Sequence, residues 1–345
     1  MSNTSDRLRV ALVDLDKKTV PEWVPQRLKQ EQIDFTYRDC TTREELAAAA
    51  HDADVVWLFG GSRILLGNLD VVPRCWAILR TGSGTDNVPV DEATRRGIVV
   101  ANTPAAFSDP VSDHVIALLF ATMRRIPFQD RAVRQGQWDQ TLGQPLSSIQ
   151  GKTLGLVGFG GIAREVAKKL AGFSLRIVAF DPFVSPEVMS RCGVQPAELS
   201  SVLADADFVS LHCPLTPETK HLIGEVQLRS MKPTAILVNT SRGPIVDELA
   251  LAKALTEGWI AGAGLDVIEH EPPAAGHPFL ELDNVVLTPH SAGLSANGVE
   301  IRWRLSFETV LAFSRRQWPA SCVNRQVKPA QNLSTMSGWE GREES

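Results

Sequence analysis

The sequence predicts an α/β protein with two domains, each built on a parallel sheet that helices cover. Three observations indicate this fold. Short β-branched runs alternate with helical patterns along most of the chain, which is typical of parallel strands joined by helical crossovers. At 345 residues, the chain is longer than one compact core usually allows. The pattern also restarts in mid-chain, at Gly151, with a strand, a glycine turn and a helix.

The first series of strands and helices extends to about Val100. Thr42–Ala50 predicts a helix, because threonine and glutamate stand near its start. The strands expected in this series are Arg9–Leu15, Asp54–Phe59, Ala77–Thr81 and Gly97–Val100. An apolar-rich helix is then expected over Asp113–Arg125, with Asp113 and His114 as capping and interface residues at its start.

The second series begins with the strand Thr153–Val157 and the helix Ile162–Gly172. Further helices are expected over Glu248–Glu257 and Glu300–Arg316. The remaining strands of this series are expected at Arg176–Phe180, Phe208–His212, Ala235–Asn239, Ala261–Val267 and Asn284–Thr288. Beyond Cys322 the chain turns polar, which predicts a loose end.

Composition excludes several classes of function. A hydrophobic fraction of 43% and a net charge of −5 are ordinary for a globular protein, and no basic cluster suggests direct nucleic-acid binding. The five cysteines are scattered without a CxxC pair, which favours reduced thiols and argues against a cysteine zinc site. The longest apolar stretch, Val115–Met123, is about half a membrane span, and no signal-peptide core is visible. We therefore expect a cytoplasmic protein.

The segment from Gly158 to Ala163 predicts a dinucleotide site, because it joins a strand to a helix. Gly158 permits the tight turn, Gly160 lets the backbone approach a pyrophosphate, and the small Ala163 lets the helix pack on the strand. Asp181 ends the next strand, 18 residues beyond Ala163, where a carboxylate can bind ribose hydroxyls and repel a 2′-phosphate. The sequence therefore favours NAD over NADP. The alternative is an ordinary glycine-rich turn with Asp181 opening an Asp-Pro turn.

Several classes of NAD enzyme do not fit. Short-chain dehydrogenases use a tyrosine with a lysine four residues on, but the single tyrosine, Tyr37, is followed by Thr41. Zinc alcohol dehydrogenases need clustered cysteine ligands, and L-lactate-type enzymes carry the glycine turn near the N-terminus.

Three late segments each follow an expected strand, so all three should lie at the carboxyl edge of one parallel sheet. They are Leu237–Gly243, Gly264–Pro272 and Thr288–Gly293. Together they offer a guanidinium, a carboxylate and an imidazole, which suits reduction of a 2-oxo acid. The arginine can bind the substrate carboxylate, the histidine can exchange the hydroxyl proton, and a glutamate beside it can orient the ring.

These segments resemble the D-isomer-specific 2-hydroxyacid dehydrogenase family, which includes phosphoglycerate and glyoxylate/hydroxypyruvate dehydrogenases and the C-terminal-binding-protein corepressors. The resemblance extends from about Leu79 to Gly293. Besides the glycine turn and the three late segments, it rests on Arg80–Asn87, on Asn102–Pro104 and on His212–Thr216 with Thr219. It implies an NAD-dependent enzyme that interconverts a small D-2-hydroxy acid and its 2-oxo acid.

The resemblance also implies roles for single residues. Arg242, Glu271 and His290 would be catalytic, with Glu271 chosen over Glu269 because it directly precedes a proline. The implied cofactor contacts are Ser83, Gly158, Phe159, Gly160, Gly161, Ile162, Ala163, Asp181, Cys213, Pro214, Thr219, Thr240, Ser241, Arg242, Asp266, His290, Ala292 and Gly293. The implied substrate contacts are Gly60, Gly61, Ser62, Ser83, Gly84, Arg242 and His290.

The implied architecture is two Rossmann-like domains with parallel sheets. Residues 1–101 and 292–330 would form a discontinuous, flavodoxin-like substrate domain, and residues 102–291 the NAD-binding Rossmann domain. Residues 331–345 would be a flexible tail, and the chain would be a homodimer through its NAD-binding domain. Two departures from the family pattern stand out. Ala163 replaces the last glycine of the turn, and Ser291-Ala292-Gly293 lacks the tryptophan of the corepressor branch.

Other interpretations stay open at this point. The same fold could serve as an NADH-sensing, corepressor-like binding protein, or as a relative that oxidises formate or phosphite. Arg242, Glu271 and His290 could each be an ordinary surface or turn residue. His270 and His277 near the glutamates raise the question of a metal site, but they lack the ligand spacing of a known site, so we expect no metal.

Overall fold

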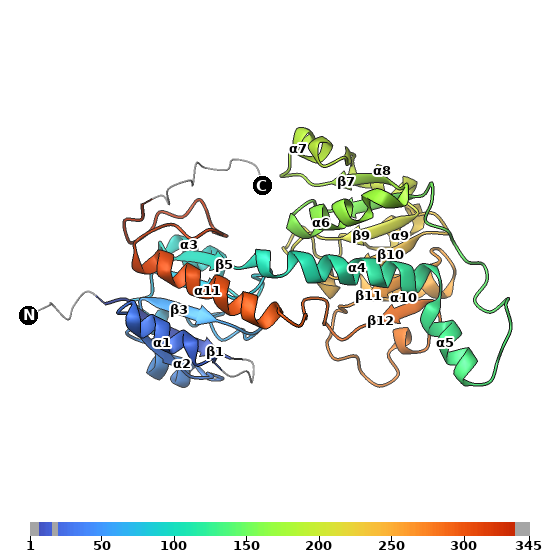
Figure 1. The fold of residues 1–345 in the computed structure, drawn as a ribbon. Coiled ribbons are helices and arrows are strands. Elements are labelled where there is room, and N and C mark those ends of the chain that lie inside the picture. Colours follow the sequence, from blue (N-terminus) through green and yellow to red (C-terminus); the bar gives the residue numbers. More distant parts are fainter. Residues whose placement is uncertain (1–6, 16–19, 335–345) are drawn as a thin grey trace, which may run out of the picture. The chain divides into compact units, whose positions relative to one another are not determined.

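The structure is a computed structural model that describes residues 7–15 and 20–334. The described chain divides into two compact units, drawn in Figure 1. Unit 1 contains the residues up to Phe107 and those from Ser295 onward, and unit 2 runs from Ser108 to Leu294. Each unit has its own parallel sheet, which confirms the expected α/β class. Among the described residues, no helix is long and apolar enough to span a membrane.

Five parallel strands form the sheet of unit 1 in the described part of the chain, in the order β2-β1-β3-β4-β5. This is the order of flavodoxin-like sheets. The strands are β1 (Arg9–Asp14), β2 (Asp34–Tyr37), β3 (Val55–Leu58), β4 (Ala77–Arg80) and β5 (Val99–Asn102). The helices and 3-10 turns are α1 (Trp23–Gln30), α2 (Arg43–Ala50), η1 (Leu69–Val71), α3 (Val90–Arg95), η2 (Pro104–Ala106) and α11 (Gly298–Ser314).

Helix α11 returns from the far end of the sequence to complete the core of unit 1 (Figure 1). Its Trp303 is fully buried, stacks on Phe59 with ring centroids 4.0 Å apart, and meets Trp57 edge-on at 5.4 Å. At the end of the described chain, the amide of Ser334 donates to the carbonyl of Arg316 over 2.8 Å. The start of the expected tail is therefore hydrogen-bonded, while residues 335–345 lie outside the described residues.

The sheet of unit 2 has the strand order β12-β11-β10-β9-β6-β7-β8, and every described pair is parallel. Its strands are β6 (Thr153–Val157), β7 (Arg176–Phe180), β8 (Gln195–Pro196), β9 (Phe208–Leu211), β10 (Ile236–Asn239), β11 (Gly262–Leu265) and β12 (Val285–Leu287). The order reverses between β6 and β9, as in Rossmann sheets, and ligands bind at the carboxyl ends of the strands near such a reversal.

The helices of unit 2 are α4 (Ser108–Met123), α5 (Ile126–Arg134), α6 (Gly161–Leu170), α7 (Pro186–Arg191), α8 (Leu199–Asp205), α9 (Glu225–Ser230) and α10 (Glu248–Thr256), with the 3-10 turns η3 (Ala171–Phe173), η4 (Gly243–Ile245) and η5 (Pro278–Leu280). Several of these helices pack on the sheet, with α8 on β6 and β7 and α4 on β10 and β11.

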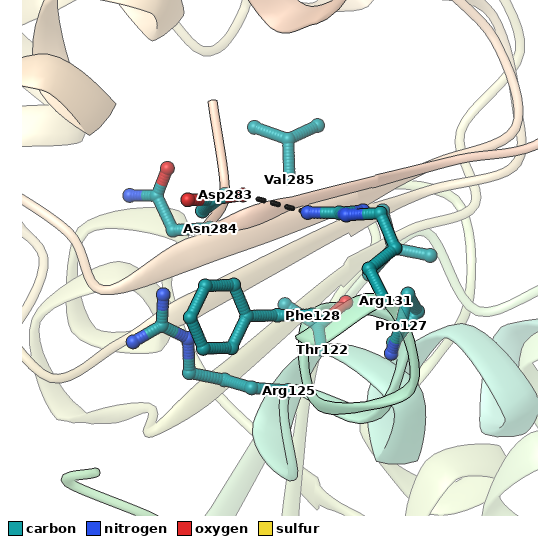
Figure 2. Close-up of a pocket in the computed structure, with 9 residues that line it drawn as sticks. Thr122, Arg125, Pro127, Phe128, Arg131, Asp283, Asn284 and Val285 are labelled. Carbon is teal, nitrogen blue, oxygen red and sulfur yellow. Dashed lines mark hydrogen bonds and ion pairs between the residues drawn. The ribbon is translucent and has the colours of Figure 1, made fainter. Parts of the chain in front are cut away.

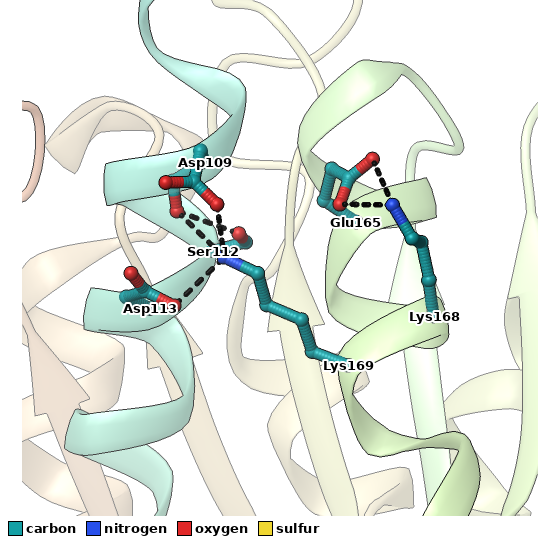
Figure 3. Close-up of polar contacts among 6 residues, drawn as sticks. All are labelled: Asp109, Ser112, Asp113, Glu165, Lys168 and Lys169. Atoms are coloured by element: carbon teal, nitrogen blue, oxygen red, sulfur yellow. Dashed lines mark hydrogen bonds and ion pairs between the residues drawn. The ribbon is translucent and has the colours of Figure 1, made fainter.

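Helix α4 packs on β10, on β11 and along α6. A Cβ at Gly264 of β11 would lie 3.0 Å from Thr122 Oγ1, so glycine allows this close approach. Figure 3 shows how α6 is joined to α4: Lys169 Nζ lies 2.7 Å from a carboxylate oxygen of Asp109 and 2.7 Å from one of Asp113. Burial lowers the pKa of Lys169, but these two hydrogen bonds outweigh it and leave the pKa raised.

Several elements differ from the sequence expectation or were not expected at all, among them α4, α5 and β2. Helix α4 begins at Ser108 and not at Asp113, so Asp113 and His114 lie inside the helix and do not cap it. Ser108-Asp109-Pro110 is a typical helix start that the apolar pattern alone overlooks. Helix α5 was not expected from the sequence. The edge strand β2 was not expected either, because it is mostly exposed and therefore has no apolar run.

Candidate active site

The glycine turn between β6 and α6 has the shape that a dinucleotide requires. Gly158 has a φ of +92°, which residues other than glycine rarely adopt, and a Cβ there would lie 2.7 Å from the amide nitrogen of Cys213. Both the backbone conformation and this close contact therefore exclude a larger residue. Gly160 has no atom within 4 Å of its missing Cβ, which leaves its backbone open to a ligand. Ala163 is fully buried between helix and sheet. The residues present therefore fit a nucleotide pyrophosphate at the N-terminus of α6.

Asp181, directly after β7, stands at this turn. One carboxylate oxygen accepts a hydrogen bond from the amide of Phe159 at 2.7 Å, and the other accepts one from the amide of Phe183 at 2.8 Å. A carboxylate offers about four acceptor sites, so lone pairs remain for ribose hydroxyls. The two hydrogen bonds thus hold the Asp181 carboxylate beside the glycine turn.

The loop after β9 packs closely against the glycine turn at Gly158. Burial lowers the pKa of His212 to about 4 and raises the pKa of the Cys213 thiol to about 11, so both side chains are neutral. The hydroxyl of Thr219 donates to the carbonyl of Pro214 at 2.6 Å and accepts from the amide of Thr216 at 2.8 Å. These bonds fix the conformation of the loop next to Gly158.

The three late segments follow β10, β11 and β12, which are neighbours in the sheet and parallel. Their side chains therefore meet at one edge. His290 Nδ1 donates to Glu271 Oε2 over 2.8 Å, which joins the segment after β12 to the loop after β11. The side chains are 47% and 38% exposed, respectively, so the pair can reach a ligand.

The electrostatics of this pair favour a charged histidine. The hydrogen bond with Glu271 raises the pKa of His290 above its usual value, against burial and the charge of Arg242, which lower it. Burial by itself raises the pKa of Glu271, but the hydrogen bond and charge of His290 outweigh burial, so this pKa lies below the usual range. The charge of Arg242 also lowers the Glu271 pKa.

Arg242 is thus within electrostatic reach of both partners. It follows β10 in a turn that Asn239 closes, since the Asn239 amide donates to the Arg242 carbonyl over 2.9 Å. Its guanidinium Nη1 donates to the carbonyl of Ser241 over 2.7 Å, and the Ser241 hydroxyl donates to the carbonyl of Leu211 in β9 over 2.9 Å. Together the three segments hold a guanidinium, a carboxylate and an imidazole at one sheet edge.

Known proteins resemble this chain in sequence and in fold. Residues 116–292 match the family described as D-isomer specific 2-hydroxyacid dehydrogenase, NAD binding domain. The chain is 42% identical over 294 residues to the glyoxylate reductase of Korarchaeum cryptofilum, an alignment that covers 84% of each chain.

The chain belongs to the D-isomer specific 2-hydroxyacid dehydrogenase family. It is 36% identical to the D-3-phosphoglycerate dehydrogenase of Methanocaldococcus jannaschii over 86% of this chain and 57% of that one. The structure of an NADPH-dependent glyoxylate/hydroxypyruvate reductase from Sinorhizobium meliloti, in complex with NADP and malonate, matches with a TM-score of 0.79 and 28% identity. That match covers 95% of this chain and all of the other. This chain is accordingly an NAD-dependent D-2-hydroxyacid dehydrogenase.

The residues that the family resemblance assigns to the substrate lie in unit 1, except for Arg242 and His290. Gly60, Gly61 and Ser62 follow β3, and Ser83 and Gly84 follow the neighbouring strand β4. The amide of Ser62 already donates to the Asp14 carboxylate over 2.9 Å, which makes Ser62 part of the loop's own support.

Sequence reasoning missed several residues that hold the site. Asn87 is buried, donates to the Ser62 carbonyl over 2.9 Å and accepts from the Arg80 guanidinium at 3.2 Å, which joins the two loops of unit 1. In unit 2, the Glu248 carboxylate accepts from the amide of Glu269 at 2.8 Å and pairs with His277 Nε2 at 3.0 Å. Glu248 therefore anchors the loop that carries Glu271.

Asp266 was expected to contact the cofactor, and in this structure its carboxylate already accepts three hydrogen bonds. They come from the Thr288 hydroxyl at 2.6 Å and from the amides of Ser291 and Ala292 at 2.8 and 2.9 Å. These residues lie in the late segments Gly264–Pro272 and Thr288–Gly293, but the hydrogen bonds that join the two segments are visible only in the structure.

A surface pocket elsewhere in unit 2 is not the active site (Figure 2). Arg131 Nη2 lies 2.6 Å from an Asp283 carboxylate oxygen at its side, and Phe128 points across it. The lining residues are Thr122, Arg125, Pro127, Phe128, Arg131, Asp283, Asn284, Val285 and Val286. Asn284 precedes β12, so this pocket lies at the amino edge of the sheet, opposite the edge that carries His290.

Proposed function

We propose that this enzyme interconverts a small D-2-hydroxy acid and its 2-oxo acid, with His290 as the general acid and base. The observation that carries the proposal is the ion pair of His290 with Glu271, within reach of the Arg242 charge. The raised pKa widens the pH range in which His290 is protonated, and the protonated ring can donate to a substrate carbonyl oxygen. In the reverse direction, the neutral imidazole accepts the proton of the hydroxyl group.

Glu271 and Arg242 have complementary roles in this proposal. Glu271 bonds Nδ1 of the imidazole, so Nε2 is the nitrogen left to face the substrate oxygen. Arg242 can bind the substrate carboxylate through two parallel N–H groups and polarise the carbonyl next to it. NADH, when bound, supplies the hydride that completes the reduction.

We assign the nucleotide to unit 2 and the remaining substrate contacts to unit 1. Backbone of the glycine turn would hold the pyrophosphate, and Asp181 would bind the adenine ribose and favour NAD over NADP. In unit 1, the backbone of Gly60, Gly61, Ser83 and Gly84 would hold the substrate carboxylate. The names of the relatives, glyoxylate reductase and glyoxylate/hydroxypyruvate reductase, support glyoxylate and hydroxypyruvate as first candidates.

We also propose a homodimer through unit 2. Helix α5 and the segment after it expose large apolar side chains, among them Ile126 at 53%, Val133 at 43% and Trp138 at 87%. Exposed apolar side chains that lie close together are a common feature of protein–protein interfaces. Light scattering after gel filtration measures the mass, and a monomer at micromolar concentration would contradict this assignment.

The test of the proposed function is a panel of 2-oxo acids with NADH, compared by kcat/KM. We expect turnover of at least one small 2-oxo acid. His290→Gln should lower kcat by about a hundredfold or more while NADH binding stays intact. His51→Gln, which changes an exposed histidine of unit 1, is the matched control. Absence of turnover by the wild type across the panel would contradict the proposal and favour an NADH-sensing role.

A further inference from the structure

A buried carboxylate, that of Asp266, is hydrogen-bonded to the segment that carries His290. Asp266, at the carboxyl end of β11, is only 2% exposed. A buried carboxylate is unfavourable unless hydrogen bonds satisfy it, and here all three partners come from the segment after β12. Its backbone carbonyl accepts a fourth bond, from the amide of His290 at 2.8 Å. Asp266 therefore holds the segment on both sides of His290.

His290 needs this support because its backbone is in the left-handed region. Its φ is +52°, a conformation that few residues other than glycine adopt without fixed neighbours. The bonds from Thr288, Ser291 and Ala292 to Asp266 bracket the residue and oppose relaxation of the turn. The direction of the imidazole thus depends on this turn.

This hydrogen-bond network extends from Asp266 through Thr288 to helix α4. Thr288 has a single hydroxyl hydrogen, which it donates to the Asp266 carboxylate. Its oxygen is then an acceptor toward His114 Nε2, which lies 2.8 Å away. His114 must therefore carry a hydrogen on Nε2 and donate it to Thr288. The same nitrogen is 3.5 Å from an oxygen of Asp266, a second favourable contact.

We propose that His114 is a positioning residue for His290 and acts through the hydroxyl of Thr288 and the carboxylate of Asp266. The inference rests on the proposed function, in which His290 exchanges the substrate proton. His114 does not itself touch the reacting groups. Its ring belongs to α4, which packs on β10 and β11, so it fixes the Thr288–Ala292 turn to a second rigid element. Donation to Thr288 also strengthens the bond that Thr288 makes to Asp266.

Three charged groups act on His290, namely Glu271, Arg242 and Asp266. Without the His114 donor, the turn can relax and the imidazole moves relative to Glu271. The pKa of His290 should then fall back toward its ordinary value, because the bond with Glu271 is the main reason that it is raised. This shift gives a measurement that does not depend on turnover.

The experiment compares His114→Leu, which removes the donor, with His114→Gln, which keeps an N–H donor. We expect His114→Leu to lower kcat for 2-oxo acid reduction by about ten- to a hundredfold. NADH affinity should be unchanged, and an NMR titration should show a lower pKa for His290. His114→Gln should restore most of both properties. His290→Gln assigns the NMR signal, and His51→Leu, on an exposed residue, is the control.

Two results would overturn the inference that His114 positions His290. One is a His114→Leu protein with the wild-type kcat and His290 titration. The other is a folded His114→Gln protein whose kcat and His290 pKa are as low as those of His114→Leu. If His114→Leu does not fold, Thr288→Val and Thr288→Ser replace it, and only the variant that keeps the hydroxyl should behave as wild type. If the wild type reduces no 2-oxo acid, the proposed function fails, while the NMR titration still tests the link from His114 to His290.

Discussion

At the scale of single residues, Glu271 has the largest effect on the pKa of His290. The Glu271 bond is the largest cause of the raised His290 pKa. Reduction needs the protonated imidazole, so in the wild type its rate should fall only as the pH rises through this raised pKa. The neighbouring Glu269 cannot replace Glu271, because its carboxylate pairs with His221.

Glu271→Gln should therefore move the alkaline limb of the reduction profile to lower pH. The neutral amide no longer favours the imidazolium, and the pKa of His290 returns toward its ordinary value. The measurement is kcat/KM for 2-oxo acid reduction as a function of pH. Glu269→Gln, two residues away, is the matched control and should leave the limb in place. An unshifted limb in Glu271→Gln would show that the ion pair does not control His290.

Asp181 offers a second prediction at this scale, on the choice of cofactor. Removing its charge should raise the preference for NADPH relative to NADH by about tenfold or more, because a like charge no longer faces the 2′-phosphate. Asp181→Asn removes the charge but keeps an acceptor for the Phe159 amide, whereas Asp181→Ala loses both. Ratios of kcat/KM for the two cofactors measure the effect. Unchanged ratios in both variants would contradict our account of Asp181.

At the scale of elements, the site depends on close contact between two loops. A Cβ at Gly243 would overlap the carbonyl group of Ile268 and lie 2.5 Å from the amide nitrogen of Glu269. The turn that carries Arg242 and the loop that carries Glu271 can therefore pack together only if residue 243 is glycine. Glu248 holds the same loop from its other side.

Gly243→Ala should push these two loops apart. We expect overpacking to lower the free energy of unfolding by about 1–3 kcal/mol. We also expect kcat to fall even at temperatures where the variant is folded, because Arg242 and Glu271 both shift. Thermal melting and 2-oxo acid turnover measure the two effects. Gly172→Ala, where no atom lies within 4 Å of the missing Cβ, should be close to wild type. Full activity of Gly243→Ala would refute the importance of this contact.

Local patterns predicted the parts of this arrangement that are local. The β6–turn–α6 segment is continuous in sequence, and Arg242 and His290 each follow a recognisable strand. Residues whose role depends on distant partners gave no such signal. His114 and Thr288 are 174 positions apart, and the place of His114 at the start of the expected helix suggested a capping and interface role. Asn87 ends the Arg80–Asn87 motif and Glu248 begins an expected helix, but their supporting roles could not be predicted, since their partners come from other loops.

At the scale of the whole molecule, the chain leaves unit 1, forms unit 2, and returns to complete unit 1. The apolar side of α11 supplies Trp303, Phe307, Val310 and Phe313 to the core of unit 1. Because these residues are far from β1 to β5 in sequence, unit 1 cannot assemble its core before the end of the chain is available. Unit 2 is continuous in sequence and has its own core.

This division predicts that the two proposed roles can be separated by one substitution. Trp303→Ala removes a fully buried ring that packs on Trp57 and Phe59, which should destabilise unit 1 by about 3–5 kcal/mol. On heating, the variant should lose 2-oxo acid turnover at a lower temperature than the wild type. NADH binding, which we assign to unit 2, should persist to a higher temperature than turnover. Tyr37→Ala, at a ring that is more than half exposed on β2, is the control for loss of an aromatic side chain in unit 1. Parallel loss of turnover and NADH binding in Trp303→Ala would mean that the two units unfold as one, and would contradict this separation of roles.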